Sequence, residues 1–167
     1  MPDIRNGLIY GRTDVALADS FDVEKQFIKT KLPEHIDYVI SSPSIRCTLL
    51  AREIAHHFIQ DDRLMELNLG LWEGKTWDTI DRTESERWME DYVYHCPPEG
   101  ETLNAMNDRV MSFWEELIVK PYQRTVIVTH AGVIRLILAK LNDLPLRSIF
   151  DIKVDYGEII GLKIEIH

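Results

Sequence analysis

The segment from Val128 to Arg135 contains a candidate for phosphate chemistry. Its sequence, VTHAGVIR, places His130 between a short apolar run and an apolar helical pattern, with two small residues after the histidine. Backbone N–H groups without partners and the positive end of the helix dipole attract anions at a helix start. A histidine there can bind a phosphoryl oxygen and stabilise charge during transfer. A lone histidine is also often a strand-end cap or a packed core residue, so this alternative stays open.

Two further side chains could complete an anion site. Arg46 lies one turn into a predicted helix that Ser42 and Pro43 open, in the capping position and the first turn. Its guanidinium could hold phosphate through two parallel hydrogen bonds. Glu66 lies in an apolar setting, where a carboxyl group can act as a general acid, and Glu73 could do the same. An exposed helix arginine and solvated glutamates are the ordinary alternatives.

The order of the predicted elements is typical of an α/β protein. Apolar periodicity predicts helices over 20–31, 43–60, 76–92, 102–119 and 132–141. Short apolar or alternating runs predict strands over 36–41, 125–129 and 158–166. Strands separated by helices imply a three-layer αβα sandwich around a mostly parallel sheet. Ligands in such sheets bind at the carboxyl ends of the strands, where 41–46 and 129–132 lie.

Composition narrows the class of protein. The chain has 167 residues, 45% hydrophobic and 28% charged, which predicts one globular domain over 1–167. A net charge of −9 argues against a nucleic-acid partner, because nucleic-acid binding requires a basic face. The apolar runs, about five residues long, are too short to span a membrane. Two distant cysteines and no visible signal peptide indicate a cytoplasmic protein, and no metal or cofactor is expected.

Five segments, in order, resemble the histidine phosphatase superfamily, whose fold is phosphoglycerate mutase-like. They are GRTDVAL, SSPSIRCT, LMELNLGLWEG, GET and VTHAGVIR, and the resemblance runs from Gly7 to about Tyr156. It implies a cofactor-free phosphatase that acts on a small phosphorylated metabolite through a phosphohistidine intermediate. The segment from Tyr10 to Val15 and the short C-terminus look most like the α-ribazole phosphatase branch, which acts in cobalamin assembly.

The resemblance also implies roles for individual residues. Arg46 matches the second arginine of the phosphate pocket, His130 matches the second histidine, and Glu66 matches the proton donor to the leaving group. Further contacts to phosphate or substrate are expected from four residues: Asn6, Arg12, Thr102 and Ala131.

The nucleophile of the family has no counterpart in this sequence. The family begins with a central strand that ends in Arg-His-Gly, and that histidine attacks phosphorus. None of the six histidines here follows an arginine, and among the others only His95 lies in a loop that could reach a pocket mouth. We therefore expect the domain to lack its first strand and the chain to be inactive as it stands, unless the strand is supplied from elsewhere.

Three interpretations follow from these residues. The first is a phosphomonoesterase, favoured over a phosphoglycerate mutase-type phosphotransferase by the short span from Gly74 to Gly100. The second is a catalytically inactive phosphate-binding protein that keeps Arg46 and His130 as a half-site. The third is an unrelated α/β domain with chance matches. A homodimer is a further expectation, because three aromatic residues could form an apolar surface patch: Trp88, Tyr92 and Tyr94.

Overall fold

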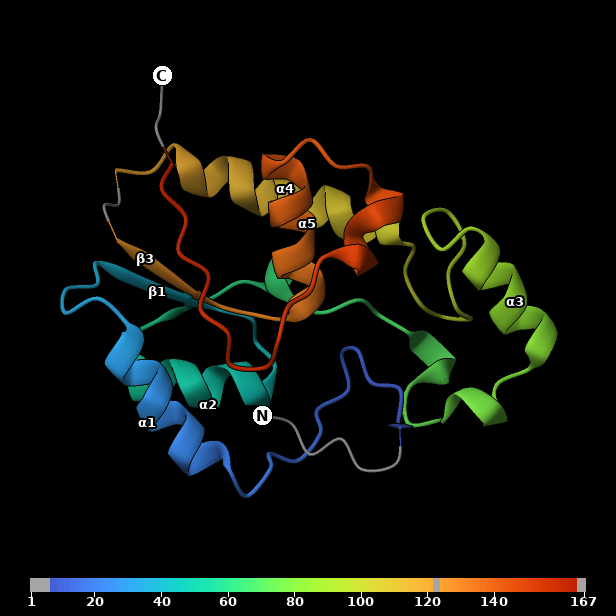
Figure 1. The fold of residues 1–167 in the computed structure, drawn as a ribbon, viewed down its shortest axis with the longest axis horizontal. Coiled ribbons are helices and arrows are strands. Elements are labelled where there is room, and N and C mark those ends of the chain that lie inside the picture. The colour runs from blue at the N-terminus through green and yellow to red at the C-terminus, as the bar shows by residue number, and fades with distance from the viewer. Residues whose placement is uncertain (1–6, 122–123, 165–167) are drawn as a thin grey trace.

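The protein packs helices on both faces of a small parallel sheet (Figure 1). The computed structural model describes residues 7–121 and 124–164. The strands are β1 (Tyr38–Ser41), β2 (Ile59–Gln60) and β3 (Thr125–Val128), in the order β2-β1-β3. The helices are α1 (Phe21–Lys31), α2 (Ile45–Ile54), α3 (Arg82–Glu90), α4 (Leu103–Ile118) and α5 (Ala131–Leu141).

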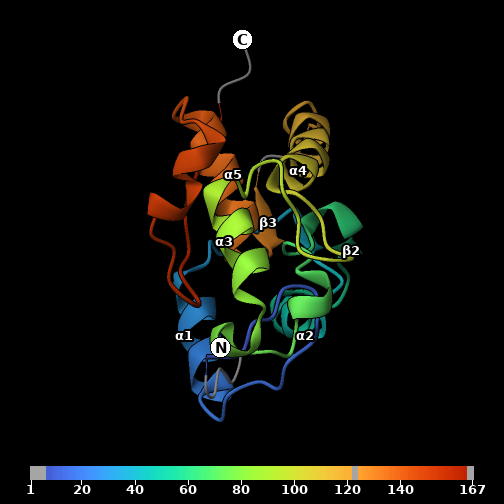
Figure 2. The ribbon, with the colours of Figure 1, turned by 90° about the vertical axis from the view of Figure 1, so that its right-hand side faces the viewer.

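The three-layer α/β prediction is confirmed. Figures 1 and 2 show α1 and α2 on one face of the sheet and α4 and α5 on the other, with α3 at one end of the molecule. The apolar stripe that predicts α4 from sequence is buried, as expected for an amphipathic helix against a core. Its buried residues are Leu103, Met106, Val110, Phe113 and Trp114. None of the helices that the described residues form is long and apolar enough to cross a membrane.

The sheet has a switch point between β1 and β3. These two strands are parallel neighbours, with Tyr38 opposite Thr125 and Ser41 opposite Val128. After β1 the chain passes to α2 on one face, whereas after β3 it passes to α5 on the opposite face (Figure 1). A crevice therefore opens at the carboxyl ends of the two strands, where ligands bind in open α/β sheets.

Two predicted helices are longer than the real ones. The helix expected over 43–60 ends at Ile54, because Ala55 takes an extended conformation and the chain turns into β2. The helix expected over 76–92 covers only Arg82–Glu90, because the Asp81 side chain caps its start by accepting the Glu84 N–H. The residues before Asp81 form a separate 3-10 turn, Trp77–Thr79.

The predicted terminal strand is wrong over 158–164, where the structure has no strand; the rest of that range lies outside the described residues. The alternating pattern is present, but a strand forms only where a neighbour satisfies its backbone groups. The sheet of the described residues has no strand that pairs with this segment. The segment 158–164 therefore has the side-chain pattern of a strand, but no neighbouring strand among the described residues with which to pair.

The outer edge of β3 is open. The carbonyl groups of Arg124 and Val128 accept N–H groups from the β1 side, at Asp37, Tyr38 and Ser42. Because alternate residues of a strand direct their backbone groups to opposite edges, Thr125 and Ile127 direct theirs away from β1. No strand of the described chain pairs with that edge. A cavity of about 1000 Å³ is lined by 125–131 and by the C-terminal segment 154–162.

Candidate active site

The switch point brings the three principal candidates together at one cavity. His130 lies two residues after the end of β3, in the position just before the start of α5, while Arg46 lies in the first turn of α2 after β1. Glu66 lies in the irregular connection that follows the 3-10 turn Asp62–Leu64. All three side chains line the same cavity, as does Ala131.

His130 is buried, with 7% of its surface exposed, and is held from both ring nitrogens. Nδ1 lies 3.2 Å from Nη2 of Arg46, which can only donate, so Nδ1 accepts. Nε2 therefore carries the proton and donates to the Ser42 hydroxyl, at 2.8 Å. Burial, followed by the charges of Arg46 and Arg109, lowers the pKa of His130 to about 3. The imidazole is neutral at pH 7, with a fixed tautomer.

This shift predicts a specific dependence of stability on pH. An unfolded histidine takes up a proton near pH 6.5, roughly, whereas folded His130 does so only near 3. Between these values the unfolded chain binds more protons, so the free energy of unfolding falls as the pH falls, by up to about 1.4 kcal/mol per pH unit.

Urea unfolding at several pH values between about 4 and 7 measures how steeply the free energy of unfolding changes with pH. His130→Gln should have the shallower slope, because the carboxylates that also titrate are unchanged in it. Equal slopes in the two proteins would show that His130 does not titrate as described.

Arg46 is the cation nearest to His130, and its side chain is only 7% exposed. Its guanidinium donates to the carbonyl oxygens of Gly11, at 2.6 Å, and Thr13, at 3.1 Å. The Asp14 carboxylate lies 3.6 Å away, and the ring of Tyr10 lies 5.5 Å from the guanidinium carbon. The loop from Tyr10 to Asp14 thus fixes where this positive charge lies.

Cys47 is not a credible nucleophile, although it neighbours the histidine. Its Sγ lies 3.7 Å from Nε2 of His130, an arrangement that resembles a thiol–imidazole pair. Burial raises the pKa of the Cys47 thiol to about 12. Since the thiolate is the reactive form, a buried neutral thiol acts only as a packing group.

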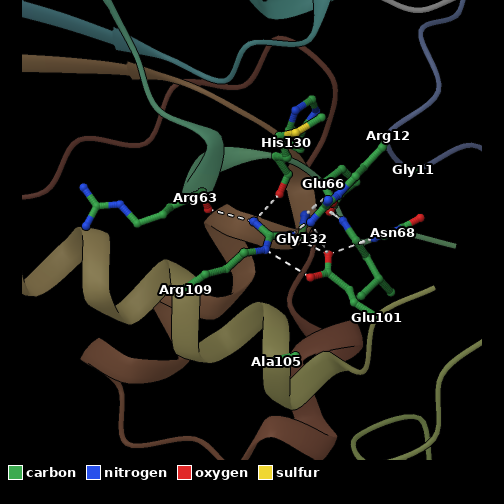
Figure 3. A network of polar contacts seen from close by, with 12 residues as sticks. Gly11, Arg12, Arg63, Glu66, Asn68, Glu101, Ala105, Arg109, His130 and Gly132 are labelled. Carbon is green, nitrogen blue, oxygen red and sulfur yellow. Dashed lines mark hydrogen bonds and ion pairs between the residues drawn. The ribbon is translucent and has the colours of Figure 1, made fainter. Parts of the chain in front are cut away.

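Glu66 reaches the start of α5 (Figure 3). Its Oε2 accepts the Gly132 N–H at 3.1 Å, and its Oε1 accepts the Leu67 N–H at 3.0 Å. A side chain at position 132 would not fit, since a Cβ there would lie 2.1 Å from Oε1 of Glu66. The carboxylate and the imidazole therefore flank one helix start.

Two glutamates organise the loops around this site. Glu73 accepts the N–H groups of Arg12, Thr13 and Leu69, at 2.6 to 3.0 Å. Burial acts to raise the pKa of Glu73, but these hydrogen bonds outweigh it, so its pKa is lowered. Glu101 accepts from Arg12, Arg109 and the Asn68 N–H (Figure 3). The sequence suggests Glu73 as a possible acid and gives no role to Glu101. In the structure Glu73 holds backbone N–H groups, and Glu101 holds two arginines and one backbone N–H.

The other residues predicted to bind phosphate or substrate make different contacts in the structure. Arg12 pairs with Glu101, at 3.1 Å, and the Thr102 hydroxyl caps α4 by accepting the Ala105 N–H. Their roles as phosphate ligands stay predictions. His95 faces the carbonyl of Arg87 near α3 and does not line the cavity. Asn6 lies outside the described residues.

The described residues show no metal-binding cluster. Residues 7–121 and 124–164 contain no group of three or more histidine, cysteine, aspartate or glutamate side chains that could hold a metal ion.

Comparison with known proteins identifies the family of the chain. Residues 4–166 match the model of the histidine phosphatase superfamily (branch 1). The chain is 30% identical to phosphoserine phosphatase 1 of Hydrogenobacter thermophilus over 76% of this chain and 64% of that protein. It is 28% identical to the adenosylcobalamin/alpha-ribazole phosphatase of Escherichia coli over 67% of this chain and 56% of that protein. It thus spans less than two thirds of either relative.

A solved structure agrees with the fold. The alpha-ribazole phosphatase from Shigella flexneri is 27% identical and superposes with a TM-score of 0.82, covering 91% of this chain and 80% of that one. The buried Arg46–His130 pair and the parallel sheet accompany a family match over nearly every residue, so the chain belongs to the histidine phosphatase superfamily.

Proposed function

We propose that the site hydrolyses phosphomonoesters through a phosphohistidine intermediate. Arg46 and His130 would bind the phosphoryl group at the start of α5, and Glu66 would protonate the leaving oxygen. The observation that carries the proposal is the meeting of these three side chains at the switch point of the sheet. Membership of a phosphatase family supports it.

The attacking histidine would come from one further strand alongside β3. Three observations support this idea: the open edge of β3, the cavity of about 1000 Å³ beside it, and the alternating segment 158–164, which forms no strand. A parallel strand in that place would end level with β3, so the residues after it would face His130 and Arg46. Without this strand, we expect the chain to bind phosphate but not to turn over.

We further propose α-ribazole 5′-phosphate as the substrate. Besides charged groups, the lining of the cavity includes apolar and aromatic side chains: Leu8, Tyr10, Leu69, Trp77 and Tyr156. An aromatic base attached to ribose would bury apolar surface there, whereas the charged ammonium and carboxylate of phosphoserine would lose hydration. The name of the Escherichia coli relative also points to this substrate.

A fusion tests the phosphatase proposal. A short run of β-branched residues followed by Arg-His-Gly is joined ahead of Met1, so that 1–6 serve as the connection. We expect the fused protein to hydrolyse p-nitrophenyl phosphate and α-ribazole 5′-phosphate and to carry an acid-labile phosphoryl group. The matched control has alanine in place of the added histidine and should show neither. An inactive fusion whose circular dichroism shows added strand would overturn the proposal.

A phosphate-binding protein without catalysis is the second candidate, favoured because His130 is the only histidine that lines the described cavity. Calorimetry with inorganic phosphate and the fusion assay separate the two candidates. Binding together with an inactive fusion favours the second. Transfer of the phosphoryl group to 3-phosphoglycerate, in preference to water, would instead indicate a mutase.

A further inference from the structure

Arg109 lies in α4 but faces the connection that carries Glu66 (Figure 3). Its Nη1 donates to the carbonyl oxygens of Arg63 and Met65, both at 2.7 Å, and its Nη2 donates to the carbonyl oxygen of Glu66, at 3.1 Å. One guanidinium therefore holds three carbonyl groups in the four residues that end at Glu66.

Glu101 holds Arg109 in turn. Its Oε1 accepts Nη2 of Arg109 at 2.6 Å, its Oε2 accepts Nε at 3.1 Å, and Oε1 also accepts the Asn68 N–H at 2.9 Å. The two side chains are only 17% and 15% exposed. Burial acts to raise the pKa of Glu101, but the bonds from Arg109 and Asn68 outweigh it, so its pKa is lowered. The backbone is thus fixed both before and after Glu66.

This clamp matters because Glu66 lies in a stretch that no helix or strand ladder holds. Residues 65–69 have no regular secondary structure, and the Glu66 carboxylate itself is tied only to the N–H groups of Leu67 and Gly132 among the contacts of the described residues. A proton donor must lie within hydrogen-bond reach of the leaving oxygen, and a shift of about 1 Å can cost roughly 100-fold in rate.

We propose that Arg109, held by Glu101, is a positioning residue that aligns the Glu66 carboxylate with the start of α5. The catalytic consequence rests on the proposed function, in which Glu66 is the proton donor. The positioning role is independent of the proposed function, because it concerns only the hydrogen bond from the Gly132 N–H to Glu66.

The first experiment needs no activity. Amide hydrogen exchange of Gly132, measured by NMR on the chain, reports its bond to Glu66. We expect exchange to be about tenfold faster in Arg109→Met and less affected in Arg109→Lys, which keeps the charge but not the planar fork. Arg63→Met is the matched control, because Arg63 ties the same segment to α4 through Glu116 without holding the Glu66 carbonyl.

The second experiment uses the fused, active form. Phenyl phosphate has a poorer leaving group than p-nitrophenyl phosphate and depends more on the proton donor. Arg109→Lys should lower kcat about tenfold more for phenyl phosphate, with KM nearly unchanged, and should add little to Glu66→Gln. A uniform loss on both substrates would indicate a merely structural role and overturn the catalytic part.

The two proposals fail in different ways. Unchanged Gly132 exchange in both Arg109 variants, in folded proteins, would overturn the positioning whether or not the fusion is active. If Gly132 exchanges faster in Arg109→Met but not in Arg63→Met, and the fusion is inactive, the positioning role is supported and the phosphatase proposal is weakened.

Discussion

Replacing Arg46 with methionine should weaken the binding of inorganic phosphate by about 100-fold, because a charge-assisted hydrogen bond contributes about 1.5–3 kcal/mol. Methionine keeps much of the side-chain volume but removes every donor. The carbonyl groups of Gly11 and Thr13 also lose their partner, so the loop that surrounds the site should loosen. Arg46→Lys should lie between, since lysine restores the charge without the paired donors.

Titration calorimetry measures the binding, and thermal unfolding shows whether each variant is folded. Arg52→Met is the control, because Arg52 lies exposed on the same helix. It should bind phosphate like the parent. If folded Arg46→Met also kept the parent affinity, Arg46 would not be a phosphate ligand.

Adding one methyl group at Gly132 should disable Glu66. The new Cβ would lie 2.1 Å from Oε1 of Glu66 and 3.1 Å from the terminal methyl group of Met106, which lies in the core. Because the carboxylate is the part that can move, Gly132→Ala should expel it from the start of α5. We expect the fused, active form to lose about 100-fold in kcat, and the chain to lose about 1–3 kcal/mol of stability.

The rate is measured with phenyl phosphate and the stability by urea unfolding. For stability, Gly161→Ala provides the comparison, because a Cβ at that glycine meets nothing within 4 Å. Parent-like turnover in Gly132→Ala would show that Glu66 does not need its present place, and the assignment of Glu66 as proton donor would fall with it.

The parts of the fold that local pattern determines were predictable. The stripe in α4 and the β-branched run of β3 follow from side-chain periodicity, and Arg46 and His130 follow strand ends at which the sheet opens. Family resemblance then indicates which of these residues bind phosphate. The meeting of Arg46, His130 and Glu66 at one cavity agrees with that expectation, while their roles stay predictions.

The parts that depend on distant partners were not predictable. Segment 158–164 has the pattern of a strand, but no strand of the described residues pairs with it. Strand β2 is only two residues long because its pairing with β1, not its composition, defines it. In the sequence, Arg109 looks like any polar residue on the exposed face of an amphipathic helix. Only the structure shows that it donates to the carbonyl groups of Arg63 and Met65. The available signal in the sequence is Glu101, a glutamate two residues before α4 begins.

The open edge of β3 also bears on how the chain behaves at high concentration. Its sequence, TVIV, is β-branched and uncharged, a composition that favours stacking between identical chains. A strand edge without a partner strand is a template for pairing with an extended segment, including one from a second molecule. If a further strand fills the cavity as proposed, it would protect this edge from pairing between molecules as well as supply the nucleophile.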